Sequence, residues 1–179
     1  IKRKKEFDLK LRIPAWVEGA SLKVNNEIIN EPLNAGTYFD LKRTWKKSDV
    51  VELNLPMTPQ LIEANPYVEQ ARNQVAVKYG PLVYCLESKD LPEGTKVQDV
   101  VIPQNIKLSP RYDANLLSGV TVLEGEAEVL NNKTWSNQSL YKKLEPKKID
   151  KVDITLIPYY TWSKRGPVDM SVWLPVVWK

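Results

Sequence analysis

The chain has 179 residues, of which 42% are hydrophobic and 27% are charged, and its formal net charge is +4. This length suffices for one large or two small domains with a substantial core, and no apolar run approaches the roughly 20 residues that cross a bilayer. Because the chain has no histidine and one cysteine, Cys85, the sequence excludes Ser-His-Asp and Cys-His catalytic sites, most zinc sites and an intrachain disulfide. The basic residues are dispersed, so we predict neither nucleic acid nor a membrane as a partner.

Short strands dominate the first part of the chain. Residues 7–13 alternate apolar and polar side chains and end at Pro14, which is typical of a half-buried strand. The pair Asn25-Asn26 can adopt the positive φ angles of a tight hairpin turn. Further strand patterns follow at residues 38–43, 50–55 and 61–64. Short strands joined by short turns indicate antiparallel sheets.

The second part of the chain continues the same style. Polarity rises between residues 65 and 73, so we predict a domain boundary near residue 70. No amphipathic helix of ten or more residues is evident, and strand patterns recur at residues 74–78, 82–87, 97–102, 119–129, 152–157 and 171–174. We therefore predict an all-β fold of two tandem antiparallel β-sandwich, jelly-roll-like modules, at residues 1–70 and 71–179. The first module is thin for a sandwich, and we expect part of one of its sheets to be missing.

Four stretches of sequence carry recognisable motifs. They are Leu9-Lys-Leu-Arg-Ile-Pro-Ala-Trp16, Trp45-Lys-Lys-Ser-Asp-Val-Val-Glu-Leu-Asn-Leu-Pro-Met57, Gly80-Pro-Leu-Val-Tyr-Cys-Leu-Glu87 and the segment at residues 154–175. In this order they resemble the C-terminal region of family 127 glycoside hydrolases, the β-L-arabinofuranosidase-like enzymes. The resemblance implies that the first module is truncated at its N-terminus. A chain that opens at Ile1, without methionine, also fits a piece of a longer protein.

The same resemblance locates the chemistry elsewhere. Enzymes of this kind use a zinc-bound cysteine nucleophile, held by further cysteines and a glutamate on an upstream (α/α)6 barrel. Cys85 matches the strand motif and not that constellation, and we expect it to be a buried, inert thiol. The resemblance implies a non-catalytic accessory region without its own cofactor, packed against the barrel of the same polypeptide, with a homodimer as a further assembly. The parent would carry zinc in its catalytic domain, cleave L-arabinofuranosyl or related bonds, and be periplasmic or secreted.

Carboxyl groups are the remaining catalytic candidates. Glycosidases generally use two of them, about 5–9.5 Å apart, one with a raised pKa. Glu124, Glu126 and Glu128 alternate with apolar residues, so they share one face of a strand. This pattern favours a solvated face over an apolar core. Glu63 and Glu69 flank the expected domain boundary, where contacts with a neighbouring domain are the better interpretation. We predict no catalytic residue in this chain.

Aromatic residues are the better binding candidates, since the chain has six tryptophans and eight tyrosines. Tyr159, Tyr160 and Trp162 precede a basic turn that contains Arg165. One interpretation is a patch that contacts sugar or the barrel, with Arg165 as a bidentate donor. In the other, alternate rings point into the core and the basic turn is solvated. The second is favoured for Tyr159, and both stay open for Trp162 and Arg165. Trp135, in a polar loop, is the tryptophan that we most expect to be exposed.

Two functional hypotheses follow. The first is the accessory region that packs against a catalytic barrel. The second is an independent carbohydrate-binding module for plant-derived glycans, which would act through Trp135 or through Tyr160, Trp162 and Arg165.

Overall fold

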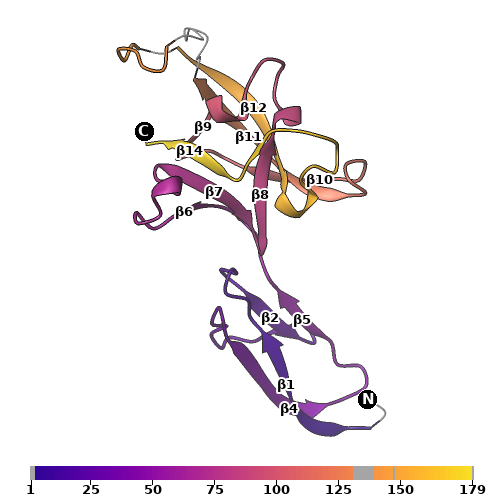
Figure 1. Cartoon of the computed structure of the whole chain (residues 1–179). Coiled ribbons are helices and arrows are strands. Elements are labelled where there is room, and N and C mark those ends of the chain that lie inside the picture. Colours follow the sequence, from indigo (N-terminus) through magenta and orange to yellow (C-terminus); the bar gives the residue numbers. More distant parts are fainter. Residues whose placement is uncertain (1–2, 131–138, 147, 179) are drawn as a thin grey trace. The chain divides into compact units, whose positions relative to one another are not determined.

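The computed structural model describes residues 3–130, 139–146 and 148–178. It contains fourteen β-strands and four short 3-10 helices, and the described residues form no α-helix. The prediction of an all-β fold is therefore confirmed. Within the same residues, no helix has the length and apolar character needed to cross a bilayer. The chain divides into two compact units, unit 1 at Ile1–Thr58 and unit 2 at Pro59–Lys179 (Figure 1).

The division between the units lies before residue 59 and not near residue 70. The predicted strand at residues 61–64 is β6 (Pro59–Glu63), and it pairs antiparallel along its full length with β7 (Gln74–Tyr79). The polar residues between these strands form their connection, including the 3-10 helix η1 (Glu69–Ala71). The rise in polarity therefore marks a loop inside unit 2 and not a domain boundary. Strand β6 belongs to unit 2 because it pairs with β7, and the local sequence pattern does not reveal that pairing.

Unit 1 consists of two small sheets on one core. One sheet pairs β1 (Lys5–Arg12) with β4 (Tyr38–Trp45), and the other has the order β3 (Glu27–Ile28), β2 (Ser21–Val24), β5 (Val51–Asn54). Both sheets contribute apolar side chains to the same cluster, whose buried members are Leu22, Val24, Leu41 and Trp45. Because all neighbouring strands here are antiparallel, the alternation in the sequence maps directly onto core-facing and solvent-facing positions.

The tight turn at Asn25-Asn26 is present as predicted. Both residues have positive φ, 53° and 67°, and they join β2 to β3. The Asn25 side chain also links this turn to the next strand, because its amide donates to Asp49 Oδ1 at 3.0 Å and its oxygen accepts from the Val50 N–H at 2.9 Å. Asn25 thus holds both the β2–β3 turn and the segment that leads into β5.

Unit 2 is a closed ring of strands with three additions. The ring runs through β7, β8, β12, β11, β9 and β14 and returns to β7, while β6 pairs with β7, β10 with β11 and β13 with β8 (Figure 1). The strands not yet bounded are β8 (Leu82–Glu87), β9 (Val100–Pro103), β10 (Ser109–Asp113), β11 (Val120–Leu130), β12 (Ile149–Pro158), β13 (Met170–Ser171) and β14 (Trp173–Val177). The expectation of an antiparallel, jelly-roll-like sandwich for this module is corrected to this six-stranded ring. Its closure depends on the parallel pair β9–β14, which no hairpin signal in the sequence could reveal.

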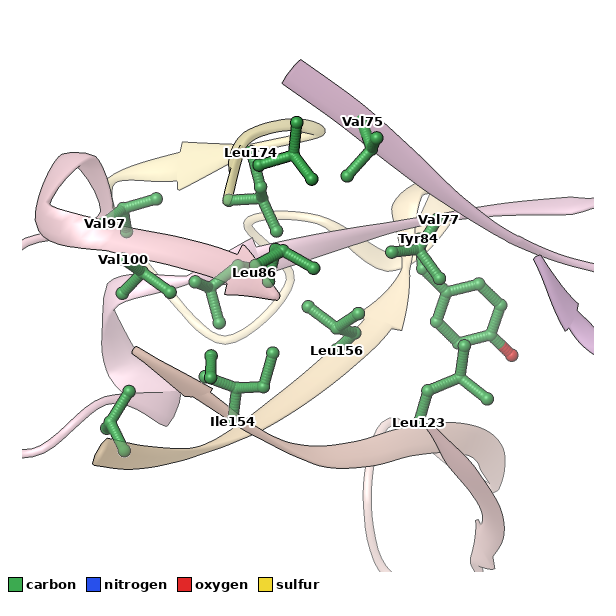
Figure 2. Close-up of a cluster of buried hydrophobic side chains, with 14 residues drawn as sticks. Val75, Val77, Tyr84, Leu86, Val97, Val100, Leu123, Ile154, Leu156 and Leu174 are labelled. Carbon is green, nitrogen blue, oxygen red and sulfur yellow. The ribbon is translucent and has the colours of Figure 1, made fainter. Parts of the chain in front are cut away.

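The core of unit 2 fills the ring, and all six ring strands supply side chains to it. Figure 2 shows Leu86 from β8, Leu156 from β12 and Leu174 from β14 pointing toward one another. Burying each such side chain stabilises the fold by about 1.5–3 kcal/mol. Cys85 points into a second small cluster and is only 1% exposed. Burial raises the pKa of its thiol to about 12, and the expectation that this cysteine is buried is confirmed.

Candidate functional site

Three exposed aromatic residues gather where β12 ends. After Pro158 the chain forms the 3-10 helix η4 (Tyr159–Thr161). In this turn Thr161, and not a ring, is the buried residue, and its hydroxyl donates to the Pro158 carbonyl oxygen at 2.6 Å. Tyr160 is 60% exposed, and Tyr159 and Trp162 are each a little less than half exposed. We call residues 159–165 the aromatic turn.

The favoured interpretation of Tyr159 as a core residue is therefore wrong. Its period-two reasoning holds only as long as the strand continues, and β12 ends one residue earlier, at Pro158. The Tyr159 ring instead stacks on Trp162, with centroids 6.3 Å apart and planes 5° from parallel. Lys164 Nζ lies 5.8 Å from the centroid of the Tyr160 ring, on which it makes a cation–π contact. The turn thus presents rings that are held by each other and by a cation.

Arg165, the last residue of the aromatic turn, is bound to two carboxylates of the protein itself. Its Nε donates to Glu87 Oε2 at 3.1 Å and its Nη1 to Asp90 Oδ1 at 2.7 Å, while Nη2 reaches both carboxylates. The Arg165 side chain is 17% exposed and that of Glu87 is fully buried. Hydrogen bonding to Asp90 in particular raises the pKa of the guanidinium. Arg165 is a bidentate donor, as the sequence suggested, but its partners are internal.

We call Arg165, Glu87 and Asp90 the buried clasp, because they tie the aromatic turn to the end of β8. Glu87 Oε1 also accepts the Ser163 N–H at 2.9 Å, and Lys89 Nζ donates to the Arg165 carbonyl oxygen. Ser163 has a positive φ of 62°, a conformation that a non-glycine residue keeps only when its surroundings hold it there. The clasp therefore fixes the backbone that displays Tyr160 and Trp162.

Sequence reasoning missed both carboxylates of the clasp. Glu87 closes the apolar run of residues 82–86, and a charge at the end of a buried strand is a weak signal that a cationic partner lies elsewhere. That partner is 78 residues away along the chain. Trp135, the tryptophan expected to be exposed, lies outside the described residues.

The carboxylates of β11 show the features of a solvated face. Glu124 accepts two hydrogen bonds from Arg111, at 2.9 and 2.7 Å, and Arg111 lowers its pKa. A general acid needs the opposite shift. Glu126 pairs with Lys151 on the exposed strand surface. Among the described residues, no group of three or more His, Cys, Asp or Glu side chains could hold a metal ion.

Comparison with known proteins gives the family. Residues 1–57 match the model of the "Beta-L-arabinofuranosidase, GH127 middle domain", and residues 59–175 match that of the "Glycoside hydrolase family 127 C-terminal domain". The junction between these matches coincides with the boundary between units 1 and 2. Among curated proteins, the chain is 30% identical over 167 residues to the non-reducing end β-L-arabinofuranosidase of Bifidobacterium longum subsp. longum, which covers 90% of this chain and 25% of that protein.

Solved structures agree with this assignment. A protein described as a glycoside hydrolase is 44% identical, with a TM-score of 0.89 over 96% of this chain and 28% of its own. A GH127 β-L-arabinofuranosidase from Geobacillus stearothermophilus T6 is 37% identical, with a TM-score of 0.88 over 97% of this chain and 27% of its own. The chain thus spans about a quarter of the length of these relatives. From the domain matches over both units, the chain belongs to glycoside hydrolase family 127, with its middle domain at residues 1–57 and its C-terminal domain at residues 59–175.

Proposed function

We propose that this chain is the non-catalytic accessory region of a family 127 glycoside hydrolase and packs against a catalytic (α/α)6 barrel of the same polypeptide. The observation that carries the proposal is the match to the middle and C-terminal domains together, which leaves about three quarters of each relative's length outside the chain. The described carboxylates support it, because Glu124 is ion-paired with a lowered pKa and Glu126 is ion-paired at the surface. Neither matches a general acid.

The activity of the whole protein is part of the same proposal. The names of the relatives favour hydrolysis of β-L-arabinofuranosyl or related bonds. The family resemblance implies a zinc ion, and we propose that it lies in the catalytic domain. We further propose a periplasmic or secreted location, where plant-derived glycans are met, and a homodimer as the assembly. Cell fractionation of the full-length protein would test the location. Sedimentation velocity of the same protein would test the homodimer.

Hydrolysis of p-nitrophenyl β-L-arabinofuranoside tests whether the catalytic activity lies outside this chain. We expect the full-length protein to release nitrophenol and the purified chain to release none. Hydrolysis by the chain, lost in Glu124→Gln and kept in Glu126→Gln, would contradict the proposal. The first substitution removes the carboxylate that Arg111 holds, and the second removes a neighbouring surface carboxylate, so the pair separates a specific site from a general effect of charge.

Contact with the catalytic domain can be tested at the aromatic turn. If Tyr160 and Trp162 are covered by that domain, Trp162→Ala lowers the melting temperature of the full-length protein by more than it lowers that of the chain alone. Tyr112→Ala is the matched control, because Tyr112 is an exposed ring of unit 2 on β10. Equal shifts in the two proteins would argue against a contact at the turn.

A carbohydrate-binding module is the second candidate function, and one observation favours it. Tyr160 and Trp162 keep large exposed surfaces on a backbone held by the buried clasp, and rigid exposed rings suit sugar stacking because little conformational entropy is lost. Arg165 is committed to Glu87 and Asp90, so the rings would have to carry the binding. Titration calorimetry with plant polysaccharides tests this: binding that Trp162→Ala weakens supports the module, and absence of heat across the panel contradicts it.

A further inference from the structure

A shallow cleft lies beside the aromatic turn, and Tyr159 is part of its lining. Four other elements converge on it: the start of β7, the 3-10 helix η3 (Val97–Asp99), β13 and β14. The polar and aromatic side chains in its lining are those of Gln74, Gln98, Tyr159, Ser171 and Trp173. None of these residues except Tyr159 was singled out by the sequence pattern.

The lining of this cleft carries no charge among the residues that the structure describes. This is unusual in a chain in which 27% of residues are charged. Other hollows of unit 2 are lined by ionic side chains, such as Lys151, Glu126 and Asp150. An uncharged lining favours an uncharged ligand, because an ion would lose its hydration there without gaining a partner.

Polar groups in the cleft are available to a ligand. The side-chain amides of Gln74 and Gln98 make no hydrogen bond to any described residue, and the same holds for the Tyr159 hydroxyl and the Trp173 indole N–H. An amide offers both donors and an acceptor. These groups match hydroxyls, each of which donates and accepts.

The aromatic side of the cleft is rigid. The Tyr159 ring is stacked on Trp162, and the backbone of the turn is closed by the hydrogen bond from the Trp162 N–H to the Tyr159 carbonyl oxygen at 3.0 Å. A fixed ring beside unpaired amides is the arrangement that recognises a molecule with apolar C–H faces and a hydroxylated rim. Saccharides have this chemistry.

We propose that the cleft formed by Tyr159, Gln98 and Gln74 binds a neutral saccharide. The ring of Tyr159 contacts the C–H face of a sugar unit and the two amides bind its hydroxyls. The inference rests on the proposed function, in that a glycan-degrading parent brings neutral sugars to this surface. It assigns the binding to the cleft and not to the exposed tip of the turn at Tyr160.

Titration of the purified chain with methyl β-L-arabinofuranoside and with neutral arabino-oligosaccharides tests this, followed by tryptophan fluorescence and calorimetry. We expect saturable binding in the millimolar range, weakened about tenfold or more by Tyr159→Ala and by Gln98→Ala, a loss of about 1.4 kcal/mol or more. Tyr112→Ala, which removes an exposed ring outside the lining, should leave the affinity unchanged.

Three results would overturn the proposal. They are no saturable binding of any neutral probe, binding that survives both Tyr159→Ala and Gln98→Ala, and tighter binding of oligogalacturonate than of the neutral sugars. The hydrolysis assay on the full-length protein is read separately. A catalytically competent parent whose accessory region binds no sugar would therefore remove this inference and leave the proposed accessory role standing.

Discussion

Removing the guanidinium of the buried clasp should destabilise unit 2 strongly. In Arg165→Met, the fully buried Glu87 carboxylate loses two hydrogen bonds and keeps one, from the Ser163 N–H, while Asp90 loses its two bonds from Arg165. Removing one partner of a buried ion pair costs about 3–5 kcal/mol, because the other charge stays buried without compensation. For a unit of this size, such a loss lowers the melting temperature by roughly 10–20 °C.

Arg111→Met is the matched control for this experiment. Arg111 also donates to two carboxylates, those of Glu124 and Asp113, with similar distances of 2.7 to 3.0 Å. Its side chain, however, is 48% exposed, so solvent screens these ion pairs and their loss should cost far less than the loss of the buried clasp. Differential scanning calorimetry compares the two variants. Melting temperatures of the two variants within about 3 °C of each other would show that burial does not set the cost of losing the guanidinium. The double variant Arg165→Met, Glu87→Gln should recover part of the stability that Arg165→Met loses.

Three further substitutions test the packing of the ring core, the close contact of Gly125 with the Lys107 backbone and the ionised Asp49 carboxylate. Leu156→Ala removes a buried side chain from the ring core and should cost about 2–5 kcal/mol in urea denaturation; a loss below about 1 kcal/mol would mean that the ring core is loosely packed. Gly125→Ala should cost about 1–3 kcal/mol, because a Cβ there would lie 2.9 Å from the Lys107 carbonyl oxygen; an unchanged denaturation midpoint would contradict this contact. The Asn25 amide, with the Lys46 N–H, lowers the pKa of Asp49, so the folded state should lose this stabilisation as the pH falls below the ordinary value of 3.8. Asp49→Asn should therefore make stability less dependent on pH between neutrality and about pH 3, and an identical pH profile in both proteins would count against it.

Local features of the fold were predictable from the sequence. Alternation at residues 7–13 gave β1, and Leu9 and Leu11 pair with Leu41 and Phe39 as core-facing positions require. The Asn25-Asn26 turn was predictable because the positive φ angles it needs depend on two residues alone. Both predictions rest on interactions within a hairpin or a single strand.

Features that depend on distant partners could not be predicted. The start of unit 2 was misplaced because β6 is assigned by its pairing with β7, and the ring closes through β14, which lies parallel to β9. At the candidate site, the exposed rings of Tyr160 and Trp162 were suspected. The commitment of Arg165 was not, because its carboxylate partners precede it by 75 and 78 residues.

The place of β14 in the ring has a consequence for the order in which the protein folds during synthesis. Every strand pairing of unit 1 is complete once residue 54 has been made, so that unit can form early. In unit 2, β14 (Trp173–Val177) links β7 to β9, and until it is made both strands have an open edge there. Open strand edges invite pairing with other chains. A nascent unit 2 therefore stays exposed to aggregation until residue 177 leaves the ribosome, and a premature stop before residue 173 would make that exposure permanent.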